Sequence, residues 1–325
     1  MTETSAKTYS PATRTVVLDT DMSPDSWIAV LFCLQRGDVD VRAVTVSGAG
    51  ESHSRPGALN AARLAGLTRR PDLPVAGGRE TPLQGNHRFP LVMRWMMDRM
   101  MFLSVPAPAR ETFAGTAVEL LLSVIEGSPG PVTLIAVGGL TNTAELLQTR
   151  PALVERLQGI YIMGGAVDVP GNIQEIVPRS PNTVAEWNIY TDPYAASVVF
   201  QSGVPITLVP LDATDQIPVS EAFRQRLRAD QTTQASRFAY RVLDRLHRLA
   251  SSRDFFLWDP MTVAVGLDDS LGTYEQRSLS VITEESLHSG QTRPDPKGVT
   301  VRVCKRIDQQ RFESVVIDAL NGRIG

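Results

Sequence analysis

The chain has 325 residues, of which 42% are apolar, and this is enough to bury a large hydrophobic core. Its net charge of -3 argues against a nucleic-acid-binding protein, which needs a basic surface to displace counterions. No run of about 18 apolar residues occurs, so the sequence predicts no transmembrane helix.

The N-terminal segment is polar and rich in Ser and Thr, and it lacks the apolar stretch of a signal peptide. We therefore expect a flexible tail over residues 1–12, followed by a single domain over residues 13–325. The two cysteines, Cys33 and Cys304, do not have the spacing of a metal site or of a disulfide scaffold. This cysteine usage predicts a cytoplasmic protein.

Strands alternate with helices along the chain. Residues 15–18 are apolar and β-branched, as in a buried parallel strand. Ser23 is a predicted N-cap and Pro24 the first residue of a helix that continues through residues 27–35. Further strands are expected at residues 41–46, 132–137, 159–163 and 206–209, with helices at 58–67 and 141–148. This alternation predicts an α/β fold with a mostly parallel central sheet flanked by helices.

Three other segments have weaker patterns. Residues 80–108 are rich in Met and Arg and read as a helix between loops that covers a pocket. Residues 229–253 read as an Arg-rich helix with a solvated face. Residues 287–298, rich in Gly and Pro, read as a hairpin loop between late strands.

Three carboxylates, Asp19, Asp21 and Asp25, follow the first strand within seven residues. Such carboxylates repel one another unless a cation lies among them, and hard cations such as calcium prefer oxygen ligands. A cation also lowers the pKa of bound water, so that a nearby Asp can remove its proton. The cluster indicates a metal and water site. Two alternatives are that these residues only cap the next helix, or that Asp19 is the nucleophile of an aspartyl phosphatase.

Five segments, in chain order, resemble the inosine-uridine nucleoside hydrolase family. The segment from Asp19 to Ser26 is similar to that family's opening pattern, Asp-x-Asp-x-Gly-x-Asp-Asp. The other four are Gly138-Gly139-Leu140-Thr141-Asn142, Ile162-Met163-Gly164-Gly165, Gly171-Asn172 with Glu186-Trp187-Asn188, and Trp258-Asp259-Pro260.

The resemblance implies a nucleoside hydrolase-like fold with an open Rossmann-like core. It also implies hydrolysis of the N-glycosidic bond of a ribonucleoside to ribose and free base, in purine or pyrimidine salvage, by a homodimer or homotetramer. Calcium would be held by Asp21, Thr141 and Asp259, with Asp19 and Ser26 as further candidate ligands. Asp21 would activate the calcium-bound water.

The resemblance further implies which side chains hold the substrate. The ribose hydroxyls would contact Asp25, Asn172, Glu186 and Asn188, and the catalytic candidates are therefore Asp21, Asp25 and Asn172. Met163 would line the sugar pocket and Trp258 would stack on the base. Each residue also has a plainer interpretation, for example Asn172 as a turn residue, Thr141 as a helix cap and Met163 as core.

The sequence departs from the family pattern at three places. Ser26 replaces an anionic calcium ligand by a neutral hydroxyl, which weakens a hard-cation site. An alternative function is therefore a homologue that binds a nucleoside or another ribosyl ligand without turnover. Trp258 stands where many members have a proton-donating His, so His87 is the best remaining candidate acid. After the second strand Glu51 follows Gly50 where many members have Asn, and we hypothesise that Glu51 enters the pocket.

Overall fold

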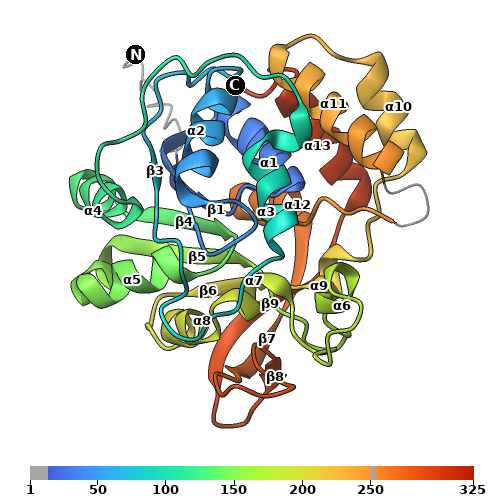
Figure 1. Ribbon diagram of the computed structural model, residues 1–325. Coiled ribbons are helices and arrows are strands. Elements are labelled where there is room, and N and C mark those ends of the chain that lie inside the picture. The colour runs from blue at the N-terminus through green and yellow to red at the C-terminus, as the bar shows by residue number, and fades with distance from the viewer. Residues whose placement is uncertain (1–13, 250–253) are drawn as a thin grey trace, which may run out of the picture.

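The computed structural model describes residues 14–249 and 254–325. The strands of these residues form one nine-stranded sheet, in the order β3-β2-β1-β4-β5-β6-β9-β7-β8 (Figure 1). All neighbours from β3 to β9 pair in parallel, whereas β7 is antiparallel to both β9 and β8. The strands are β1 (Arg14–Thr20), β2 (Val39–Val46), β3 (Val75–Gly77), β4 (Val132–Val137), β5 (Leu157–Met163), β6 (Ile206–Val209), β7 (Gly272–Val281), β8 (Thr292–Pro294) and β9 (Val299–Ile307).

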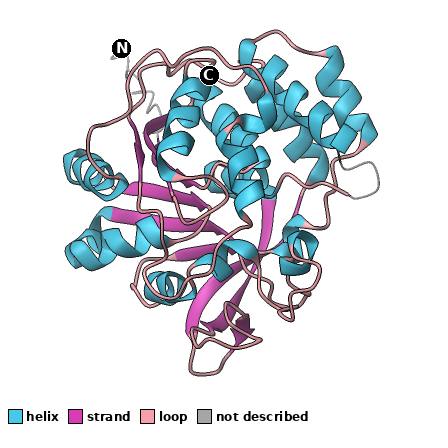
Figure 2. Cartoon of the chain, in the orientation of Figure 1, coloured by secondary structure: helices cyan, strands magenta, loops and turns pink. Residues whose placement is uncertain are grey.

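Helices cover both faces of this sheet, as Figure 2 shows. One hydrophobic cluster joins the sheet to α1 (Pro24–Gln35), α2 (Ser54–Ala65), α11 (Gln234–Leu249), α12 (Trp258–Leu267) and α13 (Gln309–Leu320). A second cluster, on the other face, joins it to α4 (Ala117–Gly127), α5 (Thr141–Thr149) and α8 (Pro193–Phe200). The mostly parallel sheet flanked by helices is therefore confirmed.

The central strand β1 shows why the sheet is buried on both sides. Val16 and Leu18 belong to the first cluster, and Val17 belongs to the second. All three are fully buried, because alternate side chains of a strand point to opposite faces and both faces carry helices.

Helix α1 begins as its local sequence predicts. The Ser23 hydroxyl accepts the backbone N–H of Ser26, and Pro24 is the first helical residue. Every residue of α1 is buried, since the helix lies among the sheet, α2, α11, α12 and α13.

The remaining helices are short or peripheral. They are α3 (Leu91–Asp98), η1 (Met100–Phe102), η2 (Pro151–Arg156), α6 (Ile173–Ile176), α7 (Trp187–Thr191), α9 (Leu211–Thr214), α10 (Glu221–Ala229) and η3 (Asp269–Leu271). In residues 14–249 and 254–325, every helix is too short or too polar to span a lipid bilayer.

Several expectations for less regular segments need adjustment. The helix expected at residues 58–67 begins earlier, at Ser54. The helix expected at 229–253 is α11, and it buries an apolar face that includes Phe238 and Val242, so it is not only a solvated surface. The segment at 287–298 contains strand β8. The predicted tail at 1–12 and residues 250–253 lie outside the described residues.

Candidate active site

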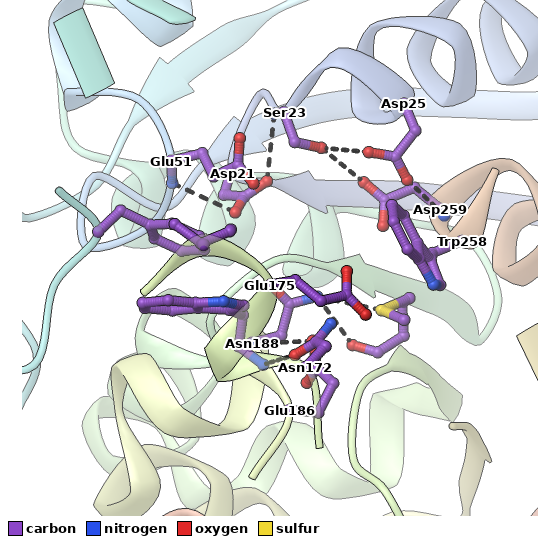
Figure 3. Close-up of a pocket in the computed structure, with 14 residues that line it drawn as sticks. Asp21, Ser23, Asp25, Glu51, Asn172, Glu175, Glu186, Asn188, Trp258 and Asp259 are labelled. Atoms are coloured by element: carbon purple, nitrogen blue, oxygen red, sulfur yellow. Dashed lines mark hydrogen bonds between the residues drawn. The ribbon is translucent and has the colours of Figure 1, made fainter. Parts of the chain in front are cut away.

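A pocket lies at the carboxyl edge of the parallel strands, where ligands bind in open α/β sheets (Figure 3). Its walls come from loops and helix starts that are distant in sequence. The lining residues are Asp21, Ser23, Asp25, Glu51, Phe89, Met163, Asn172, Glu175, Ile176, Glu186, Trp187, Asn188, Trp258 and Asp259.

One wall of the pocket is formed by Asp21, Asp25 and Asp259, which we call the acidic wall. Each is at most 4% exposed. Asp25 accepts hydrogen bonds from the Ser23 hydroxyl at 2.7 Å and from the Asp259 backbone N–H at 3.0 Å. These bonds join the β1–α1 loop to the start of α12, which lies more than 230 residues later.

Burial raises the pKa of every carboxyl in the acidic wall. It raises the pKa of Asp21 to about 6, and the neighbouring charge of Asp25 adds to the effect. Burial, Asp25 and Asp21 together raise the pKa of Asp259 well above its ordinary value. Among the described residues no lysine, arginine or histidine forms an ion pair with the wall, so its negative charge is uncompensated by protein groups.

The acidic wall has the donor chemistry of a site for a hard cation, because all of its ligating atoms are oxygens. In the described chain, however, no three His, Cys, Asp or Glu side chains already converge closely enough to hold one ion. The buried hydroxyl of Ser26 donates to Asp259 and lies 3.3 Å from Asp21 Oδ1. The serine hydroxyl therefore lies between these two carboxylates.

Glu51 lies beside the acidic wall, as hypothesised from the sequence. It lines the pocket, and its backbone N–H donates to Asp21 Oδ2 at 3.3 Å. Burial, followed by the charges of Asp21 and Asp25, raises the pKa of the Glu51 carboxyl well above its ordinary value.

The facing wall contains Met163, Asn172, Glu186 and Asn188. Glu186 accepts the N–H groups of Asn188 at 2.9 Å and Gly165 at 3.0 Å, and burial raises its pKa to about 7. Asn188 donates its side-chain N–H to the Met163 carbonyl at 3.1 Å. The side-chain oxygen of Asn172 accepts the backbone N–H of Trp187 at 3.0 Å.

The alternation of Glu186 and Asn188 along the sequence would suit one face of an extended segment, but the two residues lie at the start of a helix. Glu186 is the N-cap of α7, and Asn188 lies in the first turn of that helix. The two side chains therefore meet through a helix cap. The carboxylate of Glu186 accepts the backbone N–H groups of Asn188 and Ile189, two of the N–H groups that the start of a helix leaves without a partner.

Aromatic residues form the rim of the pocket. Phe89 stacks on Trp187 with ring centroids 4.1 Å apart. Trp258 is held by a hydrogen bond from its indole N–H to Asp215 Oδ1 at 2.7 Å. Phe89 and Trp187 line the pocket without having been expected there, although Phe89 lies in the segment predicted to cover a pocket and Trp187 lies between two candidate site residues.

Four candidates, His87, Asp19, Thr141 and Ser26, do not line the pocket. His87 instead contacts the Tyr190 carbonyl at 2.6 Å and Glu285 at 3.0 Å, so its position does not support a role as acid. Asp19 accepts hydrogen bonds from Thr45 at 2.7 Å and Asn142 at 2.8 Å, and burial raises its pKa to about 7.

Thr141 and Ser26 are buried next to the pocket. The Thr141 hydroxyl donates to Asp192 at 2.8 Å, and Asp192 does not line the pocket. The site therefore brings together nearly all the residues singled out in the sequence, with Thr141, Ser26 and Asp19 behind the lining.

The chain matches the family model described as inosine-uridine preferring nucleoside hydrolase over residues 16–314. It is 32% identical over 318 residues to a pyrimidine-specific ribonucleoside hydrolase, RihA, of Salmonella paratyphi B, covering 94% of this chain and 97% of the relative. The corresponding enzyme of Salmonella arizonae is 34% identical with the same coverage.

Solved structures show the same architecture. A plant nucleoside hydrolase superposes with a TM-score of 0.83 at 26% identity, covering 95% of this chain and 99% of that one. A purine-preferring ribonucleoside hydrolase from Gardnerella vaginalis superposes with a TM-score of 0.82 at 23% identity, covering 96% and 100%. The second likeness shows the fold alone.

Proposed function

Because the chain belongs to the inosine-uridine preferring nucleoside hydrolase family and is an N-ribosyl hydrolase, we propose that Asp21 is the base that activates water in its reaction. The reaction cleaves a ribonucleoside into ribose and free base. The observation that carries this proposal is a buried carboxylate at the pocket with a pKa of about 6, near the pH at which a general base works best.

Asp21 is held ready for this role by its neighbours. The N–H groups of Ser23 and Glu51 donate to its two carboxylate oxygens, each at 3.3 Å. In the proposed step, Asp21 takes a proton from water as the water oxygen bonds to the anomeric carbon. The N-glycosidic bond breaks, and its electron pair leaves with the base.

The ribose is proposed to lie between the two walls of the pocket. We assign its hydroxyl groups to Asp25 of the acidic wall and to Asn172, Glu186 and Asn188 of the facing wall, and the apolar side of the sugar to Met163. Carboxylates close to the ring stabilise the positive charge that develops in an oxocarbenium-like transition state. The flat side chain of Trp258, fixed by Asp215, is suited to stack on the base.

The family uses a metal ion, and for this chain we propose calcium. Asp21, Asp259 and the backbone carbonyl of Thr141 would hold it, and the uncompensated charge of the acidic wall supports this assignment. When bound, such an ion lowers the pKa of its water and orients it.

The proposal is tested by replacing Asp21→Asn. We expect kcat to fall by about 10²–10⁴-fold, the usual contribution of a general base, with folding retained. The assay measures release of free base and reducing sugar from a panel of purine and pyrimidine ribonucleosides, because relatives of both preferences occur.

Asp40→Asn is the matched control. Asp40 lies at the amino end of β2, far along the strand from the pocket, and pairs with Arg42 on the surface. This variant should keep native activity. Native-like turnover by the Asp21→Asn protein would overturn the role of Asp21.

A second candidate function is nucleoside binding without turnover, favoured by the neutral Ser26 between Asp21 and Asp259. The variant Ser26→Asp discriminates the two. If it creates hydrolysis that the native chain lacks across the whole panel, the native chain is a binding protein.

We further propose that the protein is a cytoplasmic enzyme of nucleoside salvage and that it acts as a homodimer or homotetramer. Both cysteines are buried and unpaired, as suits a reducing compartment. Sedimentation velocity of the full chain tests the oligomeric state.

A further inference from the structure

We propose that the carboxylate of Glu51 is a ligand of the cation at the acidic wall and supplies the negative charge that is missing at Ser26. This inference rests on the proposed function, because it assumes a cation between Asp21 and Asp259. It concerns the loop at residues 47–53, which follows β2 and which we call the β2 loop.

The β2 loop is built to touch Asp21. The hydroxyl of Ser52 donates to the Asp21 carbonyl at 2.9 Å, and the Ser52 N–H donates to the same oxygen at 3.1 Å. At Gly50 an added Cβ would lie only 2.2 Å from the Cβ of Asp21. Only glycine, which has no Cβ, permits this approach. The backbone of the β2 loop at Gly50 is therefore packed directly against the side chain of Asp21.

A buried arginine on α3 holds the β2 loop from its other side. Arg94, 4% exposed, donates to the carbonyls of Gly48 and Ser52, the latter at 2.9 Å. These two carbonyls bracket Glu51 in the sequence. The position of Glu51 is therefore determined by a side chain from another element as well as by the loop itself.

The carboxylate of Glu51 has no partner that would explain its location. Its Oε2 atom is buried and accepts no hydrogen bond from any residue in the described part of the chain. Its nearest charges, those of Asp21 and Asp25, are both negative. Glu51 is half-buried, and a carboxylate with one buried, unpartnered oxygen among like charges is unfavourable unless a cation joins them. Figure 3 shows Glu51 next to Asp21 at the pocket.

The number of anionic groups also supports a ligand role. The acidic wall contains three carboxylates, and the neighbouring Ser26 adds only a neutral hydroxyl. Calcium affinity depends strongly on the number of charged oxygen ligands. With Glu51 the pocket offers a fourth carboxylate, which offsets the charge that serine does not provide.

Calorimetric titration of calcium chloride into the full-length, chelator-treated protein tests this role without depending on activity. For Glu51→Gln we expect the calcium Kd to rise by about tenfold or more. Adding Ser26→Asp to Glu51→Gln should restore most of the affinity, because it returns one carboxylate to the same ion.

Glu175→Gln is the matched control, since it removes the same charge from the opposite side of the same pocket (Figure 3). Its calcium Kd should change by less than about threefold, because it lies away from the acidic wall. An equal loss of affinity in both variants would show a general electrostatic effect and would overturn the ligand role.

Thermal unfolding gives a second readout. In EDTA the Glu51→Gln variant should melt no lower than the native chain, since it loses a like-charge repulsion. In excess calcium its rise in melting temperature should be smaller than the native rise. If Glu51→Gln does not fold, Glu51→Asp replaces it. This variant keeps the charge but shortens the side chain by one methylene group, and we expect it to weaken calcium binding as well.

The calcium titrations distinguish the role of Glu51 from the presence of the cation itself. If the native chain binds calcium and the Glu51→Gln variant binds it equally well, the role of Glu51 is wrong and the proposed function stands. If the native chain binds no calcium, both the cation and its ligand are wrong.

Discussion

The Glu186 carboxyl is subject to two opposing effects. Burial favours its neutral form and raises its pKa, whereas three backbone N–H groups, those of Gly165, Asn188 and Ile189, favour the charged form. Burial is the larger effect, and the pKa rises from 4.5 to about 7. The residue that we assign to the ribose therefore titrates near neutral pH.

This pKa makes stability depend on pH. A carboxyl with a raised pKa in the folded state stabilises the fold below about pH 4.5, and the contribution is lost as pH rises through about 7. For Glu186 the loss is on the order of 3 kcal/mol. In EDTA we expect the native chain to lose more stability between pH 5 and pH 8 than Glu186→Gln does.

Urea denaturation at the two pH values measures the difference. Comparing the two proteins removes most of the contributions of Asp21, Asp25 and Asp259, whose raised pKa values act in the same direction in both. Equal slopes of stability against pH in the two proteins would contradict the prediction.

Among the elements, the contact between the β2 loop and the end of β1 controls the geometry of the acidic wall. Strands β1 and β2 are parallel neighbours that end opposite each other, with Thr20 paired with Val46. Their following loops therefore begin side by side, and the small residue Gly50 lets one loop close over the other. At the end of β4, Gly138 has the same function, since a Cβ there would lie 2.7 Å from the Asp21 backbone nitrogen.

We predict that Gly50→Ala disrupts this contact. The new methyl group must move either the β2 loop or Asp21, and the expected cost is roughly 1–3 kcal/mol of stability. Because Asp21 is displaced, kcat should also fall by about tenfold or more. Thermal unfolding and the nucleoside hydrolysis assay measure the two effects.

Gly127→Ala provides the control. Gly127 ends α4, and an added Cβ would meet nothing within 4 Å. Alanine in a helix is favoured over glycine by about 0.5–1 kcal/mol, so this variant should be as stable as the native chain or slightly more stable. A Gly50→Ala protein that matched it in stability and activity would show that the β2 loop is not tightly held.

For the whole molecule, one sheet is shared by two hydrophobic clusters. If the helices on one face detached, they would expose strands that also pack against the helices of the other face. Strand β1 is an example, since Val16 belongs to one cluster and Val17 to the other. We therefore propose that residues 13–325 form a single domain and unfold cooperatively.

Two optical probes test this cooperativity in urea. Far-UV circular dichroism reports the helices of both faces. Tryptophan fluorescence reports Trp27 in the core, Trp187 and Trp258 at the pocket, and the exposed Trp95 of α3. We expect coincident transitions. Separate transitions for the two probes would indicate that parts of the chain unfold independently.

Local sequence determined the secondary structure and the edge of the sheet that carries the site. The bounds of β4 and β6 agree with the expected strands, and α1 begins at the expected cap, because hydrophobic periodicity and capping act within a few residues. The parallel sheet then requires that the loops after β1, β2, β4 and β5 meet at one edge. The resemblance identified which side chains of that edge to examine.

Only the tertiary structure decided which of those side chains face the pocket and what surrounds them. Asp259 lies next to Asp25, and Glu51 lies next to Asp21. Glu186 and Asn188 meet at the cap of α7. His87 contacts Tyr190 and does not line the pocket. These relations join residues on different elements, and they depend on close packing at Gly50 and on the buried Arg94. No local pattern encodes such contacts, since each depends on the position of a segment distant in the chain.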